Sequence, residues 1–205
     1  MSLNEVAVSR PEDIERILKN AADNGINLLL LYEDRVGDAL HGFLDVFAKS
    51  DERFCIVFSG DRMTSVEEFY EEISSSVPFA DHMGSNLDAL NDILRFEALS
   101  PEPDRDNYWI WKNSHALYER DPESFWSLFE VMVQCSIENR PVRPGPIDNT
   151  QQLGSRTPRR LVFILTGRSE VMANYASRPD SYFFKLAHAP LFRHPSTKVV
   201  AYHLK

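Results

Sequence analysis

Two aspartates one helical turn apart are the residues of this chain whose types and spacing could do chemistry. Asp88 and Asp92 lie in the run GSNLDALNDIL over residues 84–94, and a spacing of four places both carboxylates on one helical face. Such a pair could act as acid and base in hydrolysis, or could attract a cationic partner. Like charges at this spacing destabilise a helix by roughly 0.2–0.5 kcal/mol. The sequence therefore places two acidic side chains on one helical face although their repulsion lowers the stability of the helix.

The residues around the aspartates predict how this helix is positioned. Asn86, or Ser85 before it, is a suitable N-cap, and Asn91 and Arg95 should share the face of the carboxylates. The opposite side, predicted to face the core, carries Leu87, Leu90, Ile93 and Leu94.

The rest of the pattern predicts an α/β fold. Buried strands are expected over residues 26–32, 54–58, 108–111 and 161–166, and helices after Ser9 and over 34–48, 65–76 and 123–137. Ser65 and Glu68 have the spacing of a capping box at the start of the third of these helices. The strand-helix-strand unit within the first 58 residues predicts parallel neighbouring strands with a right-handed crossover. Residues 140–160 read as an exposed loop, 169–176 as a short helix, and 198–204 as an edge strand.

This order of elements, with its motifs, resembles the barstar family of small intracellular ribonuclease inhibitors over about residues 53–167. The motifs are GSNLDALNDIL at 84–94, FSGDRMTSVEEFYEEI at 58–73, NYWIWKN at 107–113, PESFWSLFEVMVQ at 122–134 and RRLVFILTG at 159–167. The resemblance implies a three-layer fold with a mainly parallel sheet of four to five strands flanked by helices. We expect a helix-strand-helix extension at residues 1–50 on the same sheet, a barstar-like domain at 51–167, and a basic C-terminal segment at 168–205.

The resemblance also implies a function. In this family the acidic helix and the loop before it fill a ribonuclease active site, with carboxylates where the substrate phosphates would lie. Asp92 matches the deepest aspartate, and the partner-binding residues expected here are Asp88, Asp92, Asn91, Asn86, His82, Arg95 and Glu97. The family's tryptophan between the aspartates is Asn91 in this chain, and its distal acid aligns with Val131, beside Glu130. These departures favour either a different toxin as the partner or a barstar-like scaffold used for another protein.

Charge is unevenly distributed along the chain. Residues 60–106 hold twelve acidic residues and three arginines, a net charge of −9, whereas residues 151–205 hold nine basic residues and two acids, a net charge of +7. The acidic segment should attract a basic protein and repel nucleic acid. The basic segment leaves nucleic-acid binding open, or it neutralises the acidic segment of its own chain.

Other functional classes have less support in the sequence. The chain shows no Gly-rich phosphate loop, no nucleophile motif and no paired metal spacing, so we expect neither an enzyme nor a cofactor or metal. Cys55 and Cys135 are expected to be free thiols. No apolar run is long enough to cross a membrane, and a cytoplasmic monomer is favoured. Two alternatives remain: a non-inhibitory interaction or regulatory module on a barstar-like scaffold, and a hydrolase using Asp88 and Asp92.

Overall fold

The computed structural model describes residues 3–6, 10–23, 28–33, 38–77, 84–94, 105–138, 161–169 and 199–204. They build a six-stranded sheet in the order β1-β6-β2-β5-β4-β3, and all five neighbouring pairs are parallel. The strands are β1 (Leu3–Val6), β2 (Leu28–Glu33), β3 (Arg53–Ser59), β4 (Asp106–Lys112), β5 (Leu161–Arg168) and β6 (Val199–Leu204). The predicted α/β class and parallel sheet are confirmed, with six strands where four to five were expected.

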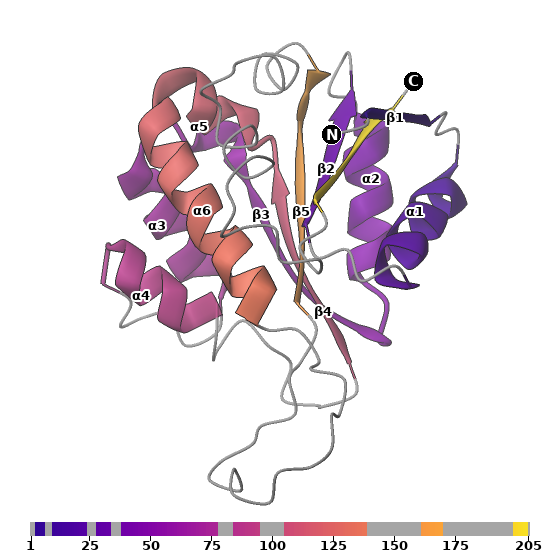
Figure 1. Cartoon of the computed structure of the whole chain (residues 1–205), viewed down its shortest axis with the longest axis horizontal. Coiled ribbons are helices and arrows are strands. Elements are labelled where there is room, and N and C mark those ends of the chain that lie inside the picture. Colours follow the sequence, from indigo (N-terminus) through magenta and orange to yellow (C-terminus); the bar gives the residue numbers. More distant parts are fainter. Residues whose placement is uncertain are drawn as a thin grey trace, which may run out of the picture.

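Helices cover both faces of this sheet and complete the three predicted layers (Figure 1). One face carries α1 (Pro11–Asp23) and α2 (Asp38–Ala48). The other face carries α3 (Val66–Ser76), α4 (Leu87–Asp92), α5 (His115–Arg120) and α6 (Pro122–Glu138), and the short 3-10 helix η1 spans Gly60–Arg62. From β1 to β3 each new strand lies farther from the β1 edge of the sheet, and from β3 to β6 each new strand lies closer to it. Because the connections between parallel strands all have the same handedness, this reversal places the helices before β3 and the helices after β3 on opposite faces.

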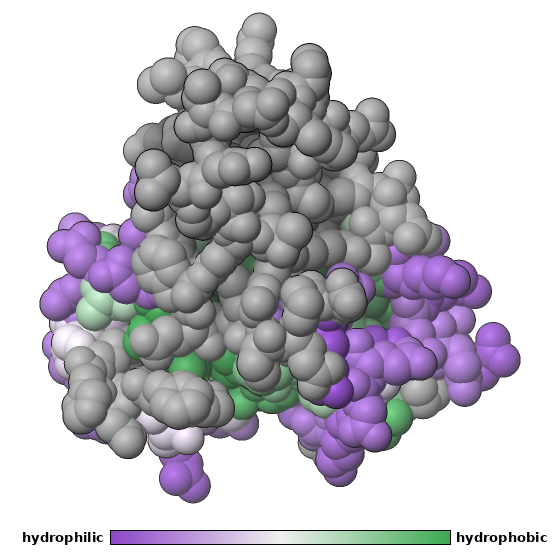
Figure 2. Space-filling model, turned by 90° about the horizontal axis from the view of Figure 1, so that it is seen from below, coloured by the Kyte–Doolittle hydropathy of each residue, from purple (hydrophilic) through white to green (hydrophobic). Residues whose placement is uncertain are grey.

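Alternating strand residues divide the core between the two faces. On β4, Trp109 and Trp111 point to the side of α3 to α6, while Tyr108 and Ile110 point to the side of α1 and α2. All four are buried, which explains why β4 is a nearly unbroken apolar run. Seen from below, hydrophilic residues cover the flanks and hydrophobic residues gather between them (Figure 2).

Two predictions of strand arrangement were wrong. β2 and β3 are parallel but are not neighbours, because β5 and β4 lie between them. The strand predicted at 198–204 is β6, which is not an edge strand because it pairs with β1 and β2; the edges are β1 and β3. Apolar patterning shows that a strand is covered on both faces, but it does not show which strand lies beside it.

Local signals were more reliable at helix ends. Ser65 is the N-cap of α3 as predicted, and its Oγ accepts from the Glu68 N–H at 3.3 Å. The sequence reading missed α5, which follows β4 directly and has no side-chain cap. The predictions for residues 140–160, 170–176 and 182–186 lie outside the described residues, and the division of the chain at residues 50 and 167 stays a prediction.

Candidate functional site on α4

An asparagine cap starts the short helix α4. Asn86 has extended backbone angles, φ −147° and ψ 163°, and its Oδ1 accepts from the Ala89 N–H at 2.8 Å. The Leu90 N–H then donates to the Asn86 carbonyl at 3.1 Å. Asn86 is thus the predicted cap, and its side-chain carbonyl is occupied within the helix.

Buried side chains hold α4 against the rest of the domain. Leu90 and Leu94 are completely buried and Ile93 is 7% exposed, all three within the core on the α6 side of the sheet. Fully burying a side chain of this kind contributes about 1.5–3 kcal/mol. Asn91 is half-buried, and its Oδ1 accepts a hydrogen bond from Cys135 Sγ on α6 at 3.2 Å. The backbone that carries the aspartates is therefore held in place by the core and by α6.

The two carboxylates lie on the solvent side of this fixed turn. Asp88 and Asp92 are both exposed, and neither has an ion pair or a side-chain hydrogen bond with another described residue. Their negative charge is consequently presented to solvent and not neutralised by the described part of the chain.

Two details of the predicted helix were wrong. Leu87, expected in the core, is 39% exposed, because it is the first residue of α4 and lies more than one turn before the α6 contact at Asn91. Asn91 does not share the carboxylate face, since its side chain points to Cys135. The exposed surface of α4 therefore combines two carboxylates with one apolar side chain.

The remaining predicted contact residues are only partly placed. His82, Arg95 and Glu97 lie outside the described residues. On α6, Val131 packs against the core, whereas Glu130 is exposed. The resemblance to the family could not show which of these two neighbouring residues is exposed. The rotation of a helix about its own axis depends on which of its residues pack against the sheet.

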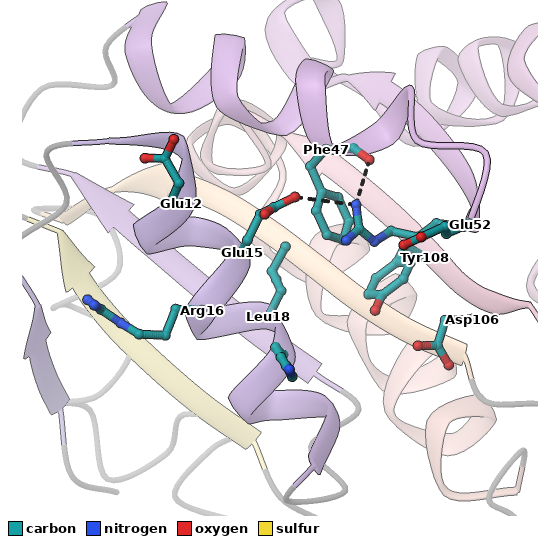
Figure 3. A pocket seen from close by; sticks show the side chains of 10 residues that line it. Glu12, Glu15, Arg16, Leu18, Phe47, Glu52, Asp106 and Tyr108 are labelled. Atoms are coloured by element: carbon teal, nitrogen blue, oxygen red, sulfur yellow. Dashed lines mark hydrogen bonds and ion pairs between the residues drawn. The ribbon is translucent and has the colours of Figure 1, made fainter.

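A separate cavity of about 540 Å³ lies at the amino ends of β3 and β4, beside α1 (Figure 3). The Arg53 guanidinium lies 4.2 Å from the centroid of the Phe47 ring, and its Nη1 is 3.6 Å from Glu15 Oε1 and 3.5 Å from the Phe47 carbonyl oxygen. Because the chain's own groups already bind this central cation, we interpret the cavity as part of the contact between α1, α2 and the sheet.

The described residues give little support to metal or thiol chemistry. Within the described ranges, no group of three or more His, Cys, Asp or Glu side chains could hold a metal ion. Cys55 and Cys135 are free, and burial raises the pKa of the Cys55 thiol to about 11, although Arg53 nearby opposes the shift. None of the described helices is both long and apolar enough to span a membrane.

Fold and site together define an α/β domain that displays an acidic helix. Residues 53–144 match the sequence model of the family described as Barstar (barnase inhibitor). The chain therefore contains a barstar-like domain, as the sequence motifs predicted, and this domain includes β3, β4 and the helices from α3 to α6. No curated protein sequence matches the chain.

Solved structures show a wider likeness of fold. A chain of the Drosophila ORC bound to DNA is similar with a TM-score of 0.51 and 14% identity, over 95% of this chain and 90% of that one. A chain of the Drosophila ORC bound to AT-rich DNA and Cdc6 gives a TM-score of 0.50 and 14% identity, over 94% of this chain. This protein spans 53% of the second chain. At this identity the likeness concerns the fold alone.

Proposed function

We propose that this protein is a cytoplasmic inhibitor, an immunity protein or antitoxin, which blocks the active site of a basic ribonuclease or another nuclease toxin with α4. The observation that carries the proposal is the pair of exposed carboxylates, Asp88 and Asp92, on a helix anchored by buried leucines. The match of this region to a family of ribonuclease inhibitors supports it.

Charge complementarity between α4 and a nuclease cleft supports this proposal. A nuclease cleft that binds phosphates carries Arg, Lys or His side chains, and a carboxylate can form charge-assisted hydrogen bonds with them. Because α4 is held by Leu90 and by the Asn91–Cys135 hydrogen bond, little conformational freedom is lost when a partner binds. Leu87, which is 39% exposed, adds an apolar contact beside the carboxylates.

The same geometry argues against catalysis by the aspartates. Acid-base hydrolysis requires a substrate held between two groups and shielded from water. Asp88 and Asp92 instead lie side by side on the exposed surface of one helix. A role in binding explains their placement better than a role in hydrolysis.

An inhibition assay tests the proposal. The full chain is titrated into basic microbial ribonucleases, barnase among them, with a fluorescent RNA substrate. Wild-type protein should inhibit at least one enzyme, and the double variant Asp88→Asn/Asp92→Asn should not. Glu12→Gln, which changes an exposed acid on α1, should inhibit normally. Failure to inhibit any enzyme, or undiminished inhibition by the double variant, would count against the proposal.

A second candidate is a non-inhibitory interaction module. Strands β1, β2, β5 and β6 lie outside the matched residues 53–144, so most of the sheet is additional to the family match. The chain also resembles ORC chains over nearly its full length. Co-purification with a protein that is neither basic nor a nuclease would favour this alternative.

A further inference from the structure

The strand β3 forms one edge of the sheet and, among the described strands, pairs only with β4. Its register with β4 is continuous over all seven residues, so no bulge interrupts the strand. Proteins commonly protect such an edge with a proline, a charged side chain, a bulge or a very short strand. Residues 54–58 include neither a proline nor a charged side chain. The central part of β3 therefore lacks the usual protection against pairing with another strand.

Two contacts show which residues of β3 direct their backbone groups away from β4. The Ser59 N–H donates to Glu72 Oε1 on α3 at 3.4 Å, and the Arg53 N–H donates at 3.2 Å to a carbonyl oxygen of the preceding turn. Successive residues of a strand direct their N–H and C=O groups to alternate sides. Because Arg53 and Ser59 both point away from β4, Cys55 and Val57 between them point away as well. The N–H and C=O groups of Cys55 and Val57, which we call the β3 edge, have no strand partner among the described residues.

The surface beside the β3 edge is apolar on the side of α2. The side chains of Cys55 and Val57 are half-buried and pack, with Phe43 of α2, against the core on that side of the sheet. Val46 lies three residues after Phe43, hence beside it on the helix, and is 63% exposed. A strand added to the β3 edge would therefore meet an apolar surface with the side chains that it directs towards α2.

The surface on the other side of the β3 edge is acidic. α3 packs against β3 and carries four glutamates and no basic residue. The Glu72 carboxylate reaches the end of the strand at Ser59, and Glu68 lies one turn earlier on the same face of the helix. The side chains that an added strand directs towards α3 would therefore meet carboxylates.

The basic residues nearby do not cancel this negative charge. Residues 49–72 hold seven acids and three basic residues, a net charge of −4. Arg53 already pairs with Glu15, while Lys49 and Arg62 are exposed, one before the strand and one after it. The excess of acid favours a cationic partner at this edge of the sheet.

We propose that the β3 edge binds, as an added strand, an extended segment of a partner protein in which apolar residues alternate with lysine or arginine. The backbone of this segment forms hydrogen bonds with Cys55 and Val57. Its apolar side chains lie on the α2 side, and its cationic side chains lie on the α3 side near Glu68 and Glu72. In strand addition, backbone hydrogen bonds give affinity and alternate side chains give specificity.

A second copy of this chain fits the β3 edge less well. Two β3 strands paired antiparallel across a two-fold axis would place both copies of α3 on the same face of the joined sheet. Each α3 carries four glutamates and no basic residue, so the two helices would repel each other. A basic segment from another protein meets attraction where the second copy meets repulsion.

A synthetic peptide and amide hydrogen exchange of the full chain, followed by NMR, test this proposal. The probe is a capped peptide in which valine alternates with lysine, and its length matches the seven residues of β3. We expect saturable protection of the Cys55 and Val57 N–H groups, with little change at Ile56, whose N–H faces β4. Because two adjacent prolines remove a backbone donor whichever way the strand lies, a peptide with this change at its centre should bind about tenfold more weakly or not at all.

The charge requirement is tested from both partners. A peptide with glutamate in place of lysine should not protect the β3 edge, because α3 repels it. Glu68→Gln/Glu72→Gln should weaken binding of the lysine peptide by about tenfold, because it removes two of the carboxylates near the edge. Glutamine keeps a side-chain carbonyl oxygen that can accept from the N–H groups that these glutamates bind now. Glu12→Gln on α1 is the matched control and should leave binding unchanged.

Several outcomes would overturn the proposal. Absence of protection at Cys55 and Val57, or equal binding of the lysine, glutamate and proline peptides, would do so, and so would undiminished binding by Glu68→Gln/Glu72→Gln. Protection of the two N–H groups that rises with protein concentration in the absence of peptide would show that a second copy pairs with the edge, against the proposal. The peptides keep the test decisive if the double variant folds poorly, and no result depends on ribonuclease inhibition by α4.

Discussion

Cys135 on α6 donates a hydrogen bond to Asn91 on α4, with Sγ and Oδ1 3.2 Å apart. A helix of six residues is not stable by itself, so α4 depends on its attachment to the 17-residue α6. The positions of Asp88 and Asp92 consequently depend on a contact that a third residue of the same helix, Asn91, makes with α6.

Cys135→Ala should destabilise the protein by about 1–3 kcal/mol, because it leaves the Asn91 carbonyl oxygen unpaired and opens a small cavity. Urea unfolding of the full chain measures the change. Cys55→Ala is the matched control, since Cys55 is half-buried on the edge strand β3 and should cost less. Equal losses for the two variants would show that the contact contributes nothing beyond burial.

Asp92→Ala should weaken partner binding more than tenfold, or about 1.4 kcal/mol, because it removes a carboxylate from the proposed contact. Glu12→Ala removes an exposed acid that pairs with Arg10 on the other face of the sheet, and it should have little effect. Binding should also weaken as salt is added, since exposed charges are screened within about 8–10 Å at physiological ionic strength. Titration calorimetry at several salt concentrations measures both effects, and similar losses for the two variants would exclude α4 as the binding surface.

Gly60→Ala should destabilise the fold by more than about 2 kcal/mol. The new Cβ would lie 2.5 Å from the Asn113 carbonyl oxygen and 2.7 Å from that of Lys112, and backbone atoms cannot move away cheaply. Gly42→Ala on α2 meets nothing within 4 Å and should stabilise by about 0.5–1 kcal/mol. Thermal unfolding distinguishes the two substitutions, and effects of the same sign would show that the close approach at Gly60 is not rigid.

Stability should fall as the pH drops below about 6.5, the ordinary pKa of histidine. Because burial lowers the pKa of His115 in the folded protein, the unfolded chain binds a proton more readily, and acid shifts the equilibrium towards unfolding. Above pH 6.5 the ring is neutral in both states and this contribution vanishes. Urea unfolding at a series of pH values measures this dependence, and in His115→Gln the free energy of unfolding should change less with pH just below 6.5. An unchanged slope in the variant would show that other groups cause the loss of stability in acid.

Local signals predicted most of the elements and part of the site. Ser65 and Asn86 cap α3 and α4 where the sequence placed them, because a cap is a bond between residues three apart. The apolar runs located β2, β3, β4 and β5 to within about two residues, since side chains covered on both faces leave a continuous hydrophobic pattern.

Long-range neighbours were decided only by the tertiary structure. The separation of β2 from β3, the interior position of β6 and the pairing of Asn91 with Cys135 join residues far apart in the chain. The hydrogen bonds of Thr166 belong to the same class, because Thr166 meets His41 across 125 positions and Asn113 across 53.

The sequence by itself thus determined that two aspartates share the solvent face of a capped helix, because helical spacing is a local property of the chain. Only the folded structure decided that Leu87 is exposed, that Asn91 faces α6, and that a polar cluster forms at the carboxyl edge of β5. Those features depend on which surfaces pack together, and packing is set by the whole sheet and not by any one segment.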